Sequence, residues 1–157
     1  MKKPFLSILL ASLFAIAAQA QAPTATPAAT TPGGVTRVTY MDVLPGKTNE
    51  LTTFIRTHTI PIMEEQKKQG LILGYGYFTK PTTEGPGDWD LGLLVSYKNY
   101  ADAVDFNADR NAKFDAIGLA HYGTAEARTK ANDSLNALRT VTSSMLVRGL
   151  TFNPMPK

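Results

Sequence analysis

The spacing of apolar and polar residues changes several times along this chain of 157 residues, and each change predicts a new element of secondary structure. Residues 35–44 are rich in Val, Thr and Tyr, which favour a pleated strand, and the turn residues Pro45 and Gly46 follow. Residues 47–69 have apolar side chains at helical spacing. Because Pro61 removes a helix hydrogen bond, we expect a kink or two helical pieces near residues 59–61. The apolar face of this helix consists of Leu51, Phe54, Ile55, His58 and Ile62.

Two apolar stretches, residues 71–79 and 91–97, follow with almost no polar alternation, which is typical of strands covered on both faces. A turn-rich loop at residues 80–89 joins them. From residue 99 the helical spacing returns and predicts a helical segment, a second one around residues 114–119, and a third. Thr124 is the expected N-cap of the third, and we assign His121 and Tyr122 to the connecting loop before it. Residues 140–150 have strand character again.

The order of these elements is β-α-β-β-α-(α)-β, which predicts an α+β, ferredoxin-like fold with a four-stranded antiparallel sheet and an extra helix. Helices in this fold cover one face of the sheet only. The two apolar strands, which we place at its centre, require cover on both faces. A second copy of the same sheet provides that cover, so the sequence predicts an isologous homodimer.

The first twenty residues have the three parts of a secretory signal peptide. Lys2 and Lys3 precede an uncharged apolar run at residues 5–18, and Ala18-Gln19-Ala20 has the small-x-small form of a cleavage site. The apolar run is shorter than the ~20 residues that span a bilayer. Residues 21–34 consist mainly of Pro, Thr and Ala and predict a disordered linker. The domain is therefore expected at residues 35–152, with a short tail at 153–157.

Composition narrows the compartment and the partners. The chain has no cysteine, which excludes disulfides, thiolate catalysis and a lipidated N-terminus. Removing Lys2 and Lys3 with the signal peptide leaves 14 basic against 13 acidic residues. No basic run remains to bind nucleic acid. We expect a periplasmic or secreted protein with no membrane anchor after cleavage.

The stretch VTYMDVLPGKTNEL, a helix that ends at Gln69-Gly70, and the strands LILGYGYF and DWDLGLLVSYKNYADA together resemble the dimeric α/β-barrel superfamily, which includes proteins like the antibiotic-biosynthesis monooxygenases. The resemblance implies a dimer whose sheets form a barrel, with a pocket between each sheet and its helices. Members include cofactor-free monooxygenases, haem proteins, isomerases and uncharacterised exported proteins. The superfamily shares no catalytic set, so the resemblance assigns no residue role.

Five residues are candidates for a site. His58 lies on the apolar helix face, where it acts as a general base or orients a ligand, or else is a buried histidine hydrogen-bonded to a neighbouring side chain. The strand tyrosines either hold a polar ligand with their hydroxyls while the rings pack against it, or fill the barrel or the dimer interface. The tryptophan at the loop-to-strand junction either forms the lip of a pocket or anchors the packing there. The candidate ligand-binding residues are Tyr40, Tyr75, Tyr77 and Trp89.

The sequence predicts no metal site and no cofactor, because neither His58 nor His121 has an acidic partner at the spacing of a metal motif. Three hypotheses about function remain. The first is an exported, homodimeric protein that binds a small apolar or aromatic ligand. The second is a cofactor-free monooxygenase-like enzyme acting on a phenolic or quinol-like substrate. The third is a cell-envelope interaction module that displays the loop at residues 80–89.

Overall fold

The computed structural model describes residues 28–80, 82, 85 and 88–155. The predicted signal peptide and the first part of the predicted linker lie outside these residues, as does part of the loop at 80–89. Among the described residues, no helix has the length and apolar character needed to cross a membrane. The strands are β1 (Thr30–Val43), β2 (Gly74–Thr79), β3 (Leu91–Tyr97) and β4 (Arg139–Phe152). The helices are α1 (Thr48–Phe54), the π-helical segment η1 (Ile55–Thr59), α2 (Ile60–Lys68), α3 (Tyr100–Val104), α4 (Ala108–Tyr122) and α5 (Ala125–Asn136).

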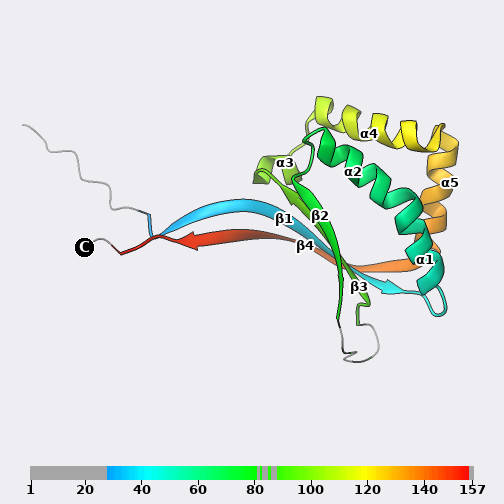
Figure 1. Cartoon of the computed structure of the whole chain (residues 1–157), viewed down its shortest axis with the longest axis horizontal. Helices are drawn as coiled ribbons and strands as arrows, with labels where there is room; N and C mark the ends of the chain where they lie inside the picture. The colour runs from blue at the N-terminus through cyan, green and yellow to red at the C-terminus, as the bar shows by residue number, and fades with distance from the viewer. Residues whose placement is uncertain (1–27, 81, 83–84, 86–87, 156–157) are drawn as a thin grey trace, which may run out of the picture.

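The sheet has the strand order β2-β3-β1-β4, and every neighbouring pair is antiparallel. This order, together with the βαββαβ succession of elements, confirms the α+β ferredoxin-like fold that the sequence predicts. The helices lie on one face of the sheet (Figure 1). The buried apolar side chains of the core are Val35, Val38, Met41, Leu51, Ile72, Val95, Ala103, Ile117 and Leu138.

Two strand predictions are corrected. β1 begins at Thr30, so residues 30–34 of the predicted linker belong to a strand that pairs with the end of β4. Gly33 and Gly34 allow the close approach of these strands, because a Cβ at Gly33 would lie 3.3 Å from the carbonyl oxygen of Gly149 in β4, and one at Gly34 would lie 3.1 Å from that of Tyr97 in β3. The second correction concerns β2, the first of the two apolar strands. It begins at Gly74 and lies at the edge of the sheet, whereas we expected it at the centre. An apolar run indicates burial and does not specify the position of a strand in its sheet.

The first helix is divided as predicted, since α1 and α2 are separate α-helical pieces. The five-residue π-helical segment η1 joins them, and Pro61 lies in the first turn of α2. Pro61 has no N–H group, and in α-helical geometry its ring would clash with the carbonyl of Thr57. A wider helical turn immediately before the proline relieves this clash, and it is also the turn that contains His58.

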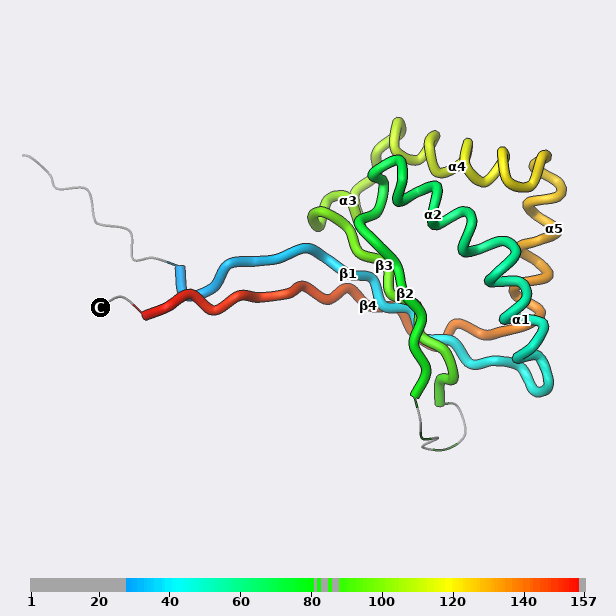
Figure 2. Tube along the Cα trace, in the orientation of Figure 1, coloured from blue at the N-terminus to red at the C-terminus, as the bar shows by residue number. Residues whose placement is uncertain are grey.

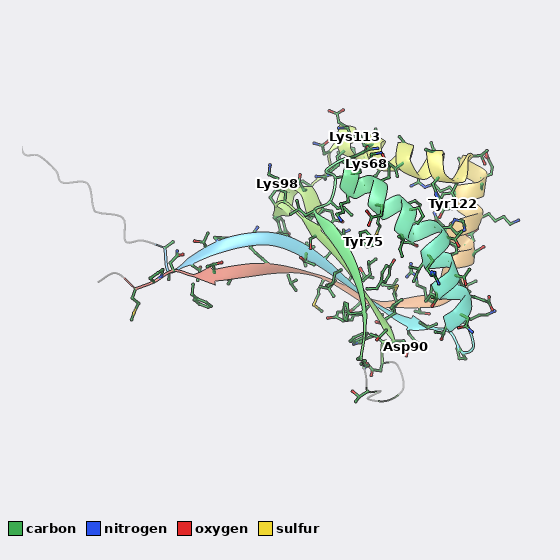
Figure 3. All side chains as sticks on the ribbon, in the orientation of Figure 1. Lys68, Tyr75, Asp90, Lys98, Lys113 and Tyr122 are labelled. Atoms are coloured by element: carbon green, nitrogen blue, oxygen red, sulfur yellow. The ribbon has the colours of Figure 1, made fainter. Side chains whose placement is uncertain are left out.

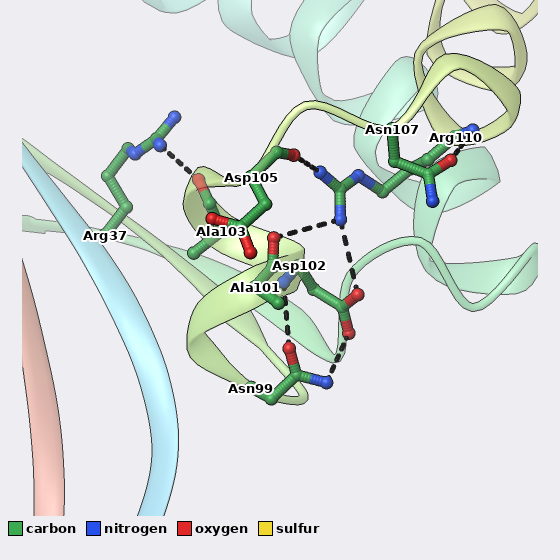
Figure 4. Close-up of polar contacts among 8 residues, drawn as sticks. All are labelled: Arg37, Asn99, Ala101, Asp102, Ala103, Asp105, Asn107 and Arg110. Carbon is green, nitrogen blue, oxygen red and sulfur yellow. Dashed lines mark hydrogen bonds and ion pairs between the residues drawn. The ribbon is translucent and has the colours of Figure 1, made fainter.

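Side chains from two neighbouring elements hold the short helix α3 against the sheet (Figure 4). Asn99 caps its N-terminus by accepting a hydrogen bond from the Asp102 N–H at 2.8 Å. At the other end, Arg37 of β1 donates to the carbonyl of Ala103 at 2.6 Å, and Arg110 of α4 donates to the carbonyls of Ala101 and Asp105. These arginines satisfy carbonyls that the end of a helix leaves without partners.

Candidate functional site

The two histidines of the chain meet between η1 and the end of α4. The Nδ1 atom of His58 lies 3.0 Å from the Nε2 atom of His121, which is hydrogen-bond distance. One ring nitrogen donates and the other accepts, as two neutral imidazoles can do. We expected His121 in a loop, and the structure corrects this, because His121 occupies the last turn of α4. A histidine near the C-terminus of a helix also suits the helix dipole.

Aromatic rings enclose this histidine pair. The centroid of the His58 ring lies 4.8 Å from that of Phe54 and 5.4 Å from that of Tyr122. Tyr122 follows His121 on α4 and lies on the helical side of the sheet (Figure 3). Partial burial, and secondarily the charge of a protonated His121, lower the pKa of His58 below its ordinary value. His58 is therefore neutral at pH 7.

Cavities that open widely to solvent lie on both sides of the pair. His58 lines one of about 490 Å³, together with α1 and the residue before β4, and His121 lines another of about 470 Å³ between α2 and α4. Phe54 and Leu138 form the apolar part of the first wall. The polar part of that wall comes from Asn49, Glu50, Thr53, Thr57 and His58. Among the described residues, the Nε2 atom of His58 has no hydrogen-bond partner.

The predicted ligand-binding residues divide between the two faces of the sheet. Tyr75 and Tyr77 are on the helical side, with Tyr75 between β2 and the helices (Figure 3). The Tyr75 hydroxyl donates to Glu64 Oε1 at 2.6 Å, and this bond, with the burial of the ring and the charge of Glu64, raises the pKa of Tyr75 to about 12. Burial raises the pKa of Tyr77, a residue of the same face of β2.

Tyr40 and Trp89 lie on the opposite, open face. Their ring centroids are 5.0 Å apart, and Phe78 packs against both at 5.9 and 5.3 Å. The Phe78 ring occupies the space that a side chain at Gly92 would fill. Because residues alternate between the faces of a strand, this cluster and the histidine pair are on different sides of the sheet. The structure therefore does not bring the five predicted residues into one pocket.

The open face continues across the sheet with apolar side chains. Register places Met145 opposite Val38 and Val147 opposite Thr36. Met145 is 47% exposed and Val147 is 43% exposed, although both lie in a four-stranded sheet. No helix of the described chain covers this face (Figure 1). Exposed apolar side chains in a contiguous patch indicate an interaction surface.

Within the part of the chain that the structure describes, no group of three or more His, Cys, Asp or Glu side chains could hold a metal ion. The sequence did not predict that the two histidines meet, because residues 63 positions apart give no local signal that they lie close together. The signal that could have indicated this contact is the helical spacing of apolar residues, which continues to residue 122 and would have placed His121 on a helix.

Comparisons with known proteins support no residue role. No protein-family model matches the chain, and no curated protein matches it. Solved structures similar to it include HapK from Hahella chejuensis, at a TM-score of 0.48 and 6% identity over 78% of this chain and 99% of that one. A NIPSNAP family protein from Agrobacterium tumefaciens has a TM-score of 0.41 and 22% identity over 73% and 89% of the two chains. A dimeric ferredoxin-like protein of unknown function from Bacteroides fragilis has a TM-score of 0.40 and 14% identity over 74% and 95%. The fold assignment rests on the strand order described above.

Proposed function

We propose that this chain is an exported, homodimeric protein that binds a small apolar or aromatic molecule in the cavity beside His58. The observation that carries the proposal is the cavity of about 490 Å³ walled by Phe54, Leu138 and a neutral histidine. Small-molecule sites typically enclose about 300–1,000 Å³ and combine apolar walls with a few polar groups. Export rests on the signal-peptide pattern of residues 1–20.

The wall chemistry favours an uncharged ligand with one polar group. Phe54 and Leu138 suit an aromatic or aliphatic body, and the free Nε2 of His58 suits a hydroxyl or carbonyl group. The carboxylate in the wall, Glu50, is already paired with Lys47 at 2.7 Å, so it has less attraction for a cationic ligand. A phenol or a similar aromatic alcohol satisfies both requirements.

The homodimer part of the proposal rests on the open face of the sheet. Met145 and Val147 expose apolar surface there beside the cluster of Tyr40, Phe78 and Trp89. A second copy would cover this face isologously, with the same patch contributed by both subunits. The ligand cavity is on the helical side, so dimer formation would leave it open.

Mass spectrometry of the natively purified protein tests whether it retains a bound ligand. NMR with 1-naphthol as the probe tests where a ligand binds. We expect amide shift changes at Phe54, His58 and Leu138, and at least fivefold weaker binding in His58→Ala. Lys98→Ala, an exposed change at the far end of β3, is the control and should bind as the wild type does. Shift changes confined to the open face, or none at all, would refute this location.

One observation favours a second candidate function. A neutral His58 with a free Nε2, held by His121 beside an apolar cavity, is placed as a general base for a phenolic proton. A cofactor-free monooxygenase would require such a base. An oxygen electrode with hydroquinone as the substrate tests this candidate. Oxygen uptake by the wild type that is lost in His58→Ala supports it. If neither the wild type nor the variant exceeds the uptake of buffer, hydroquinone is excluded as a substrate and ligand binding is the one function still supported.

A further inference from the structure

The hydrogen bond between the two histidines lies between two cavities. The Nδ1 atom of His58 and the Nε2 atom of His121 bond to each other, which leaves one nitrogen of each ring, Nε2 of His58 and Nδ1 of His121. Neither of these has a hydrogen-bond partner among the described residues. His58 lines the cavity beside α1, and His121 lines the cavity between α2 and α4. Each cavity is therefore served by one ring of the same hydrogen-bonded pair.

The cavity beside His121 lies where two helices are neighbours. The Cα trace shows α2 and α4 side by side (Figure 2). Apolar side chains such as Ile62 and Ala120 form much of the wall, and the volume of about 470 Å³ is typical of a small-molecule site. The carboxylate of Glu65 already accepts a hydrogen bond from Gln69 at 2.9 Å, so it has less attraction for a cationic ligand. An uncharged molecule that bonds to His121 suits this wall.

The hydrogen atom of the histidine bond relates the two free nitrogens to each other. A neutral imidazole has one N–H group and one lone pair. If His58 donates through Nδ1, its Nε2 is an acceptor, and Nδ1 of His121 carries the hydrogen; if His121 donates through Nε2, both roles reverse. Any other combination of neutral rings sets two N–H groups or two lone pairs against each other at 3.0 Å and loses the bond. Of the two free nitrogens, one is therefore a donor and the other an acceptor.

We propose that the cavity beside His121 is a second small-molecule site, and that it takes a hydrogen-bond acceptor when a hydrogen-bond donor occupies the site beside His58. This inference rests on the binding function proposed above and adds a second ligand to it. A phenol that donates to Nε2 of His58 fixes the arrangement in which Nδ1 of His121 is a donor. The matching ligand is an uncharged carbonyl compound. A second phenol would find no acceptor, because the pair offers one lone pair at a time.

The tautomers of the two rings test the coupling directly. Long-range ¹H–¹⁵N NMR of the labelled mature chain distinguishes Nδ1–H from Nε2–H in each ring at pH 8, where histidine side chains are ordinarily neutral. We expect equal tautomer populations in His58 and His121, since the hydrogen-bonded arrangements have the hydrogen on Nδ1 of both rings or on Nε2 of both. Addition of 1-naphthol should shift both rings toward Nδ1–H. Unequal populations, or a response of His58 alone, would overturn the coupling.

Acetophenone probes the second cavity, because its carbonyl group accepts a hydrogen bond and cannot donate one. We expect saturable amide shift changes at Ile62, Ala120 and His121, and at least threefold tighter binding when 1-naphthol saturates the first site. By linkage, acetophenone should tighten 1-naphthol binding by the same factor. No saturable change up to 10 mM acetophenone would overturn the second site. Equal affinity with and without 1-naphthol would overturn the coupling.

The variant Ala120→Leu fills the second cavity and changes neither histidine. It should weaken acetophenone binding at least fivefold, while 1-naphthol alone binds within twofold of its wild-type affinity. Ala127→Leu is the matched control, because Ala127 is an exposed residue of α5 and lines neither cavity. Equal effects of the two variants on acetophenone would overturn the location. Failure of 1-naphthol to bind beside His58 would instead refute the proposed function, and the tautomers of the ligand-free protein would still decide whether the two rings are coupled.

Discussion

His58 and His121 are 63 residues apart in the sequence, and their ring nitrogens Nδ1 and Nε2 lie 3.0 Å apart in the structure. One comes from a π-helical segment and the other from the last turn of α4. π-helical turns are uncommon and often occur at functional sites. The pair connects η1 with α4 on one face of the sheet. The protonation state of the two rings therefore depends on how these helices pack.

The first prediction concerns the pKa of His58. Burial and His121 both lower this pKa, so removing His121 by His121→Ala should raise it while leaving it below the ordinary value near 6.5. The chain has two histidines, so an NMR titration of the tag-free protein can follow the imidazole signals of each ring separately. Tyr122→Phe keeps the neighbouring ring and is the control. A wild-type His58 that titrates at or above pH 6.5 would contradict the prediction.

The second prediction follows for stability. The unfolded chain protonates His58 near pH 6.5, whereas the folded chain protonates it at lower pH. In the window between the two values the unfolded state binds more protons, so the free energy of unfolding falls as the pH is lowered through it. Urea denaturation of the wild type and His58→Gln at pH 7.5, 6.5 and 5.5 measures this effect. The difference between the two proteins should change over this range, and a constant difference would exclude the effect.

The third prediction concerns packing on the open face. A methyl group at Gly92 would meet the Phe78 ring, so Gly92→Ala must displace that ring from Tyr40 and Trp89. Overpacking of this kind costs about 1–3 kcal/mol. Gly76→Ala in the neighbouring strand is the matched control, because a Cβ there meets no atom within 4 Å. Denaturant unfolding should show a clear loss of stability in Gly92→Ala and little change in Gly76→Ala. Equal effects would show that the packing of the Phe78 ring does not require a glycine at position 92.

The sequence predicted the order of elements, the interruption before Pro61 and the N-cap at Thr124, because each depends on local spacing or on the chemistry of one residue. Residues 30–34 looked like a linker because Pro and Gly disfavour strands, and only pairing with β4 overrides that preference. The sequence could not show whether Tyr40 and Tyr75 lie on the same face of the sheet. Alternation assigns residues to faces within one strand, whereas the register between strands depends on contacts between residues far apart in the sequence.

The last prediction concerns the link between β2 and α2. The hydroxyl of Tyr75 donates to Glu64 at 2.6 Å, and the pKa of Tyr75 is raised to about 12 chiefly by this bond. The bond is exposed to solvent, so Tyr75→Phe should cost no more than about 1 kcal/mol. Glu64→Gln removes the carboxylate charge and should let Tyr75 ionise at lower pH. The ultraviolet difference titration between each protein and its Tyr75→Phe counterpart isolates this one tyrosine.

The same pair makes the folded state sensitive to alkali. The unfolded chain loses the Tyr75 proton near pH 10, and the folded chain keeps it to about pH 12. The contribution of Tyr75 is therefore fully present below pH 10 and is lost as the pH rises toward 12. Urea unfolding at pH 8, 9.5 and 10.5 should show the wild type losing its advantage over Tyr75→Phe at the highest pH. An advantage that stays constant to pH 10.5 would mean that Glu64 does not hold the Tyr75 proton in solution.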